Sequence, residues 1–374
     1  MWPVSDAYLA RFPESKLRHF RVMILDPLTL SESTVFEGNT AVVMSGNISA
    51  VDSLFERTAS FTTLWVHGDD DPIGTTVRIE CGVTVSEGQV EWVPMITLVI
   101  DELDIDFTGA NAVYDIRGRD RLGFMAETVF GGVWSAAPGD SVGAVIRRIC
   151  QEAGLGFSDE LYDIDDAGRV LAIAFNMEED DTRGDAVQRL MNDHSLVVRC
   201  RPDGVVEVRP HQDVSVSPVV ATFGSGPQGT LLSGNISFSQ AGRFNRVIVV
   251  GEAPDIVPVR AEARDMDPLS PTYNPPDGTG PLGDRVAPIE HSPDIRSYDQ
   301  AYERARQLLE EYTLLSEVVT FSAVSLPPLT IGDRVAVLVE SADTGYDVIV
   351  DRIEWPLGVG AMAITGRRWR PVHG

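Results

Sequence analysis

FNRVIVVG, residues 244–251, is a short run of mostly β-branched residues closed by glycine. Such a run predicts a buried strand bounded by turn residues. The segments DMDPLSPT (265–272) and PPDG (275–278) follow it. Their prolines keep them out of a sheet interior, because each proline removes a ladder donor and fixes φ. A long irregular loop is therefore expected after the strand.

Residues 297–315 predict one long helix. Ser297 and Gln300 have the spacing of a capping box. Apolar residues recur at helical period on one face, namely Tyr298, Ala301, Ala305, Leu308 and Tyr312. After Pro327 and Pro328 the pattern changes to period two in DRVAVLV (333–339), and YDVIVDRI (346–353) predicts a partner strand.

This order of elements resembles the C-terminal half of the tail-hub, or baseplate-hub, proteins of long-tailed bacteriophages. The similarity is greatest to minor tail proteins of phages that infect actinobacteria. The order carries the resemblance, which spans most of the chain, rather than any single motif. Its carriers are the Asn-Arg-Val strand at 245–247, the Asp-Pro-Leu-Ser-Pro loop at 267–271, the helix with Gln300 and Leu308, the strand at 331–335, the closing segments at 350–353 and 356–358, and the opening Trp2-Pro3-Val4-Ser5.

Composition limits the classes to which the protein can belong. With 374 residues and 43% hydrophobic content, the chain is long enough for two to four globular domains. Its apolar runs are far shorter than the ~20 residues of a bilayer crossing, so no membrane span is expected. No charged and apolar leader opens the chain, which favours synthesis in the host cytoplasm. The net charge of -26 argues against ordinary nucleic-acid binding, which needs a basic surface.

The expected fold class is α+β and β-dominant, with two related β-barrel or sandwich domains, a small α/β insert, and a C-terminal helix with strands. The expected divisions are an N-terminal arm (1–20), a first β domain (21–135), the α/β insert (136–212), a second β domain (213–296), and the helix with closing strands (297–374). Strands of the first β domain are expected near Phe20–Leu25, Phe61–Val66, Thr76–Cys81, Met95–Ile100 and Ala112–Arg117.

Two helices and a hairpin are expected in the insert. Asp140 is expected to cap the first helix, which Gly154 ends, and Thr182 with Asp185 begins the second. The hairpin turns at Pro202-Asp203-Gly204. Apolar faces of the helices are expected from Val142, Val145, Ile146 and Ile149 in the first, and from Ala186, Leu190 and Met191 in the second.

A pentapeptide suggests an internal duplication. Ser-Gly-Asn-Ile-Ser occurs at 45–49 and again at 233–237, and each copy is followed by Phe-x-Arg, at 55–57 and at 244–246. Both copies stand at corresponding points of the expected β domains. Two related β domains, or a chance match of a short peptide, would both account for the repeat.

Several local patterns invite a catalytic or binding interpretation. Gly224, Gly226 and Gly229 fit a dinucleotide motif, but Pro227 stands where a helix would have to open, so a loop between strands is expected. Asp163, Asp165 and Asp166 resemble the start of a calcium loop. Alanines at 167 and 174 occupy ligand positions, which favours a solvated turn.

The remaining polar groups are similarly weak candidates. The acidic residues 69–71 favour a turn, and Asp101, Asp104 and Asp106 favour a charged strand edge. His194 is expected to be a partly buried helix residue, and Cys81, Cys150 and Cys200 are expected to be buried free thiols. No catalytic residue, cofactor-binding residue or metal ligand is assigned, and no cofactor is expected.

The resemblance implies a structural component of a phage virion without enzymatic activity. It implies a homotrimeric, pseudo-sixfold hub ring at the tail tip, through whose lumen the genome passes without specific binding. The implied partners are a distal tail protein, the tape-measure protein and a tip or receptor-binding protein. The alternative is a tail protein that binds or degrades cell wall, either a glycoside hydrolase or a lectin, since 56 acidic residues offer many carboxylate pairs.

Overall fold

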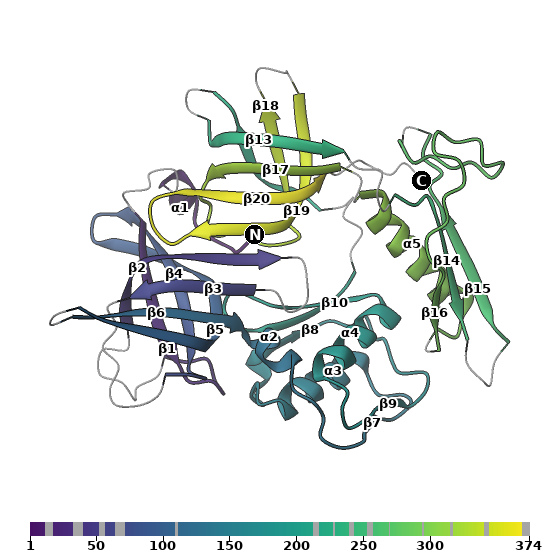
Figure 1. Ribbon diagram of the computed structural model, residues 1–374, viewed down its shortest axis with the longest axis horizontal. Coiled ribbons are helices and arrows are strands. Elements are labelled where there is room, and N and C mark those ends of the chain that lie inside the picture. The colour runs from purple at the N-terminus through teal and green to yellow at the C-terminus, as the bar shows by residue number, and fades with distance from the viewer. Residues whose placement is uncertain are drawn as a thin grey trace.

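The computed structural model describes residues 1–11, 18–32, 40–51, 57–63, 72–108, 111–211, 217–226, 229–238, 243–252, 257–268, 270–293, 295–314, 317–339 and 344–368. Strands dominate, and the expected β-dominant α+β class is confirmed. Figure 1 shows two β-rich bodies next to each other, the insert below them, and α5 with a separate small sheet to one side.

The first β domain is a closed barrel. Its strands follow the order β1-β4-β5-β6-β3-β2, and β2 returns to pair with β1 at Arg21 and Val42. Alternate residues such as Val22, Ile79 and Phe61 point into a continuous buried core. The strands are β1 (Arg18–Leu25), β2 (Thr40–Val51), β3 (Arg57–Thr63), β4 (Thr76–Ser86), β5 (Gln89–Thr108) and β6 (Asn111–Asp120).

A second set of six strands repeats this order. Its spatial strand order is β12-β18-β19-β20-β17-β13. When the strands of each set are counted along the chain, both sets have the same spatial order: first, fourth, fifth, sixth, third, second. Two differences distinguish this second barrel. Strand β12 pairs in parallel with β18, whereas β1 is antiparallel to β4, and among the described residues no pairing of β12 with β13 closes the set as β1 with β2 closes the first. These strands are β12 (Val219–Gly224), β13 (Leu231–Phe238), β17 (Glu317–Val324), β18 (Arg334–Val339), β19 (Thr344–Pro356) and β20 (Ala361–Arg368).

The α/β insert has its own core, which also includes Leu25 and Leu30 from the first β domain. The second expected capping box, Thr182 with Asp185, is confirmed. Ser141, not the predicted Asp140, caps α3, because the Asp140 carboxylate accepts from the Ala137 amide instead. Helix α2 (Arg121–Ala126) directly follows β6 and links the first barrel to the insert. The elements of the insert itself are β7 (Trp134–Ala136), α3 (Val142–Glu152), η2 (Asp159–Leu161), β8 (Tyr162–Ile164), β9 (Phe175–Met177), α4 (Arg183–His194), β10 (Leu196–Cys200) and β11 (Val206–Pro210).

A small α/β unit interrupts the second barrel. Helix α5 (Tyr298–Leu314) packs on a sheet of β14 (Arg246–Gly251), β15 (Val259–Arg264) and β16 (Glu290–Ser292). The predicted capping box of α5 is confirmed: Gln300 N–H donates to Ser297 Oγ, and Ser297 N–H donates to Gln300 Oε1, both at 3.2 Å. The predicted division between 296 and 297 therefore separates α5 from the sheet on which it packs. The division into domains itself stays a prediction.

A short helix, α1 (Asp6–Arg11), lies against the first barrel, where Tyr8 is buried with Val83 and Val93. The Trp2 N–H donates to the carbonyl of Pro328 over 2.7 Å, so this segment contacts both β domains. Among the described residues, no helix combines the length and apolarity needed to cross a membrane.

Candidate functional site

The two barrels repeat one detail of side-chain chemistry. In the first, β5 carries a bulge between Ile100 and Glu102, opposite Gly118 of β6. Asp101, the bulged residue, accepts a hydrogen bond from Arg119 Nε at 2.7 Å. A Cβ on Gly118 would overlap the Val99 carbonyl oxygen, so only glycine fits opposite the bulge.

The second barrel has the same arrangement at the same place. The bulge of β19 lies between Val350 and Arg352, opposite Gly366 of β20. Asp351 accepts from Arg367 Nε at 2.8 Å. A Cβ on Gly366 would overlap the Ile349 carbonyl oxygen. The sequence carries this repeat as Ile-x-Gly-Arg at 116–119 and 364–367, a signal that could have predicted the matched bulges.

The repeated pentapeptide lies on corresponding strands. Gly46 of β2 pairs with Phe61 of β3, and Gly234 of β13 pairs with Phe321 of β17. The strand order and the pairing register of the two barrels therefore support the duplication that the pentapeptide suggests. The predicted Phe-x-Arg extension of the repeat is wrong, because Arg57 begins β3 whereas Arg246 begins β14, outside the second barrel. Residues 55 and 56 lie outside the described residues.

The two barrels are joined edge to edge. Residues 352–356 of β19 pair antiparallel with residues 47–51 of β2, so that Glu354 lies opposite Ser49 and Trp355 opposite Ile48. The Leu357 N–H extends this ladder by donating to the Gly46 carbonyl over 2.9 Å. Both Ile48 and Trp355 are buried, at 1% and 4% exposure. The junction is thus a continuous sheet with a dry apolar side.

The insert is fixed to the first barrel through the turn between β10 and β11. Four carbonyl oxygens of this segment, those of Cys200, Pro202, Asp203 and Gly204, accept side-chain hydrogen bonds of 2.8 to 3.0 Å from Arg57, Thr97, Arg78 and Arg121 respectively. Burial lowers the pKa of Arg78 and Arg121. Because buried carbonyl groups need donors, these bonds hold the insert in one orientation.

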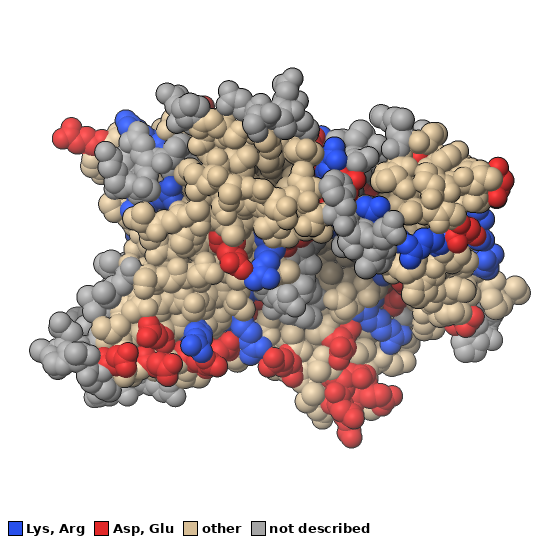
Figure 2. Space-filling model, turned by 45° about the horizontal axis from the view of Figure 1, so that its top comes forward, with Lys and Arg blue, Asp and Glu red and all other residues tan. Residues whose placement is uncertain are grey.

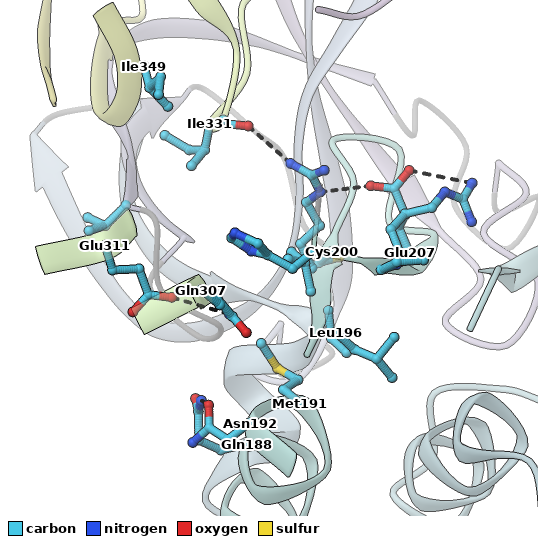
Figure 3. A pocket seen from close by; sticks show the side chains of 18 of the residues that line it. Gln188, Met191, Asn192, Leu196, Cys200, Glu207, Gln307, Glu311, Ile331 and Ile349 are labelled. Atoms are coloured by element: carbon cyan, nitrogen blue, oxygen red, sulfur yellow. Dashed lines mark hydrogen bonds and ion pairs between the residues drawn. The ribbon is translucent and has the colours of Figure 1, made fainter. Parts of the chain in front are cut away.

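A cleft of about 800 Å³ lies where the insert, α5 and the barrels meet (Figure 3). Arg199 reaches across it, donating to the Ile331 carbonyl at 3.1 Å and to Glu207 at 2.7 Å. On the α5 side, Gln307 donates to Glu311 at 3.2 Å. The lining carboxylates therefore hold protein groups in place. This arrangement suits a contact surface between domains.

Asp120 is the most perturbed carboxylate of this cleft. Its side chain caps α2 by accepting from the Gly123 amide at 2.7 Å. Complete burial raises its pKa to about 6, although nearby Arg57 acts in the opposite direction. A raised pKa can mark a catalytic acid, but a helix cap in a domain junction explains this one equally well.

The sequence motifs have structural explanations. The glycines at 224, 226 and 229 connect β12 to β13, two strands, as predicted. The Asp163 carboxylate pairs with Arg209 and Arg201, and Asp166 accepts from the Ser141 hydroxyl and from the Gly143 amide at 3.0 Å. These contacts tie the turn at 163–168 to α3 and β11.

The other candidates are dispersed. Asp101 pairs with Arg119, while Asp104 and Asp106 lie exposed on β5, the charged strand edge that was predicted. His194 is buried at the end of α4. Burial raises the pKa of Cys81, Cys150 and Cys200 to about 12, so these free thiols stay protonated. The acidic residues 69–71 lie outside the described residues. Within the described residues, His, Cys, Asp and Glu side chains form no group that could hold a metal ion.

The surface carries the acidic surplus of the sequence. Figure 2 shows Asp and Glu side chains along the lower rim of one face, with some basic side chains among them. The full chain has 56 acidic and 30 basic side chains, so the average surface repels phosphate.

No protein-family model and no curated protein matches the chain. Solved structures do match it. The tail protein from Neisseria meningitidis MC58 has a TM-score of 0.64 and 15% identity, covering 95% of this chain and 97% of its own. The 43 kDa tail protein of prophage MuSo2 from Shewanella oneidensis has a TM-score of 0.62 and 12% identity, covering 94% and 98%.

An E. coli component of the type VI secretion system, described as structurally similar to the T4 bacteriophage tail proteins gp27 and gp5, has a TM-score of 0.52 and 10% identity over 89% of this chain and 75% of its own. At such identities the likeness shows the fold alone. The chain has the fold of phage tail proteins, and the expected resemblance is confirmed at that level. None of these comparisons tests the expected actinobacterial host.

Proposed function

We propose that this protein is a structural component of a phage tail tip. Three copies form a hub ring that joins the tail tube to the tip and surrounds part of the channel through which the genome leaves. The phage infects an actinobacterium, and the neighbours are a distal tail protein, the tape-measure protein and a tip or receptor-binding protein. The protein has no enzymatic activity of its own.

The observation that carries this proposal is the duplication, with both barrels joined edge to edge in one sheet. A chain with two equivalent barrels offers two equivalent surfaces. Three chains can therefore present six barrel surfaces to a sixfold tube, while the three chains themselves match a threefold tip. Likeness of fold to phage tail proteins supports the same assignment. The matched bulges and ion pairs give the two barrels the same local geometry, which such a ring requires.

The charge balance supports a channel wall that does not hold DNA. Phosphates bind to basic surfaces by releasing counterions, and bound DNA would stall during ejection. A chain with a net charge of -26 has carboxylates to spare for a repelling wall. The purified protein is therefore expected to leave double-stranded DNA unbound even at low ionic strength, where screening is weakest.

Sedimentation of the purified protein tests the ring. The expected mass is three times the chain mass of 40.7 kDa. A protein that stays monomeric at high concentration would argue against a self-assembling ring. A parallel assay on actinobacterial cell wall separates the proposal from a wall-degrading enzyme: saturable release of sugar or peptide, abolished by one carboxylate substitution, would favour the enzyme.

A further inference from the structure

Each barrel has a strand edge whose counterpart in the other barrel is paired. Strand β5 pairs with β4 only as far as Val99, although it continues along β6 to Thr108. Its residues 102–106 therefore have an edge without a partner strand among the described residues. Strand β13 pairs with β17, and no described strand pairs with its other edge.

The duplication identifies what these open edges correspond to. Glu102 follows the bulge of β5 as Arg352 follows the bulge of β19, so residues 102–106 match residues 352–356. The shared pentapeptide matches residues 235–237 with residues 47–49. The counterparts of the two open edges are thus the two strands that pair with each other at the internal junction.

Burial differs between the junction and the open edges. Trp355 is 4% exposed in the junction, whereas Ile105, its counterpart, is 39% exposed. Ile48 is 1% exposed, whereas its counterpart Ile236 is only half-buried. Counterparts of the apolar side chains that the junction covers are therefore accessible at both open edges. An unpaired strand edge with apolar side chains is a template for a further strand.

We propose that the open edge of β5 in one copy pairs antiparallel with the open edge of β13 in a second copy, in the register of the internal junction. Asp104 then lies opposite Ser237, as Glu354 lies opposite Ser49, and Ile105 lies opposite Ile236. The inference rests on the proposed function, because it gives the hub ring its contact between subunits.

Charge makes the pairing heterologous. Glu102, Asp104 and Asp106 are exposed on the β5 edge, whereas β13 presents the neutral Ser233, Asn235 and Ser237. Two β5 edges would set like charges opposite each other, which destabilises a strand pair. The pairing of β5 with β13 avoids that repulsion. A contact between two different surfaces closes into a ring when its rotation allows.

Engineered disulfides test the register. At the junction the hydrogen bond from Leu357 to Gly46 makes these two residues a bonded pair, so Glu354 and Ser49 form a non-bonded pair. Such pairs have Cα atoms about 4.5 Å apart, within the range of a disulfide. The test variant is Asp104→Cys with Ser237→Cys in the full-length protein, oxidised and run without reductant. The three native cysteines are buried and do not compete.

Two matched variants serve as controls. Glu354→Cys with Ser49→Cys places the same pair at the internal junction, and is expected to form a disulfide within one chain. Asp104→Cys with Ser233→Cys is four residues out of register on the same exposed strand, and is expected to form no cross-link. The test variant is expected to give covalent dimers and trimers that reductant returns to monomer.

The outcomes separate the register from the ring. A protein that sediments as a trimer but gives no Asp104–Ser237 cross-link overturns the strand pairing and leaves the proposed ring standing. Equal cross-linking of the test pair and the out-of-register pair overturns the proposed register. A protein that neither cross-links nor associates overturns both. Ile105→Asp provides an independent measurement. It should shift the equilibrium from trimer towards monomer and leave the melting temperature of the monomer unchanged. A trimer that persists in this variant would contradict the pairing.

Discussion

Arg119 donates its Nε hydrogen to the carboxylate of Asp101 over 2.7 Å, across the bulge at which β5 has one residue more than β6. Arg367 and Asp351 repeat this relationship in the second barrel at 2.8 Å. The bulge re-aims the strand in both places, since an extra residue bends and twists the strand that carries it. Matched substitutions should therefore have matched effects in the two barrels.

Gly118→Ala and Gly366→Ala should each destabilise the protein by about 1–3 kcal/mol or more, because the added methyl group overlaps a backbone carbonyl oxygen that cannot rotate away. Thermal unfolding gives the comparison. Gly132→Ala is the control, since nothing lies within 4 Å of its Cβ position. If only one of the two bulge variants loses stability, the barrels are not equivalent at this position.

Arg121→Ala should loosen the insert from the first barrel. Arg121 donates to the Gly204 and Pro27 carbonyls, both at 3.0 Å, and to that of Leu155 at 2.5 Å, so its loss leaves three carbonyl groups without this donor. The expected cost is about 3 kcal/mol or more, at roughly 1–3 kcal/mol for each unsatisfied group. Urea unfolding measures it, and a separate early transition of the insert is expected.

Arg260→Ala is the matched control, because Arg260 is 56% exposed and its contact to Glu262 is 3.8 Å long. Exposed pairs contribute about 0–1 kcal/mol. Equal losses in the two variants would show that the bonds of Arg121 to the insert contribute no more than a surface pair.

Asp120→Asn should change how stability depends on pH. Burial raises the pKa of Asp120 from 3.8 to about 6, so the folded state binds a proton more tightly than the unfolded state. The stability of the unsubstituted protein therefore falls as pH rises from about 4 to about 6. Asparagine keeps a capping side chain but cannot ionise.

Over that window the free energy of unfolding of Asp120→Asn, relative to the unsubstituted protein, should rise by up to about 3 kcal/mol, at about 1.4 kcal/mol for each pKa unit. Urea unfolding at pH 4 and pH 7 provides both values. A difference that stays constant between the two pH values would mean that Asp120 does not titrate there.

Local signals were predicted well from the sequence, and long-range pairing was not. The capping boxes at Ser297 and Thr182 follow from residues three apart, so neighbouring residues specify them. The choice of Ser141 over Asp140 as a cap depends on which amide each side chain meets after folding. Two adjacent capping residues cannot be ranked by spacing alone.

The junction of β2 with β19 joins residues some 300 positions apart, and periodicity carries no information about such a partner. The small unit of β14 to β16 and α5 also separates β13 from β17, which made Arg246 look like the counterpart of Arg57. The open edges of β5 and β13 follow only from the strand order and register of the folded barrels, which local sequence patterns do not encode. Only the acidic character of β5 was visible beforehand.

Leu308→Asp should cost several kcal/mol, because Leu308 is 9% exposed in the core that α5 forms with Val247 and Ala261, and an unpaired charge there is poorly solvated. Tyr302→Asp is the control on the same helix, since Tyr302 is 40% exposed. Circular dichroism melting compares them. A near-normal melting temperature for Leu308→Asp would mean that α5 is not held by this face.

The most direct test of the central claim is the averaged electron cryo-microscopy density of the tail end of intact particles. The account predicts three copies of this chain in a ring between the tube and the tip. Six barrels should surround a lumen, with β5 of each copy against β13 of the next. Density for the chain in a peripheral fibre, or a tail end without this chain, would contradict it.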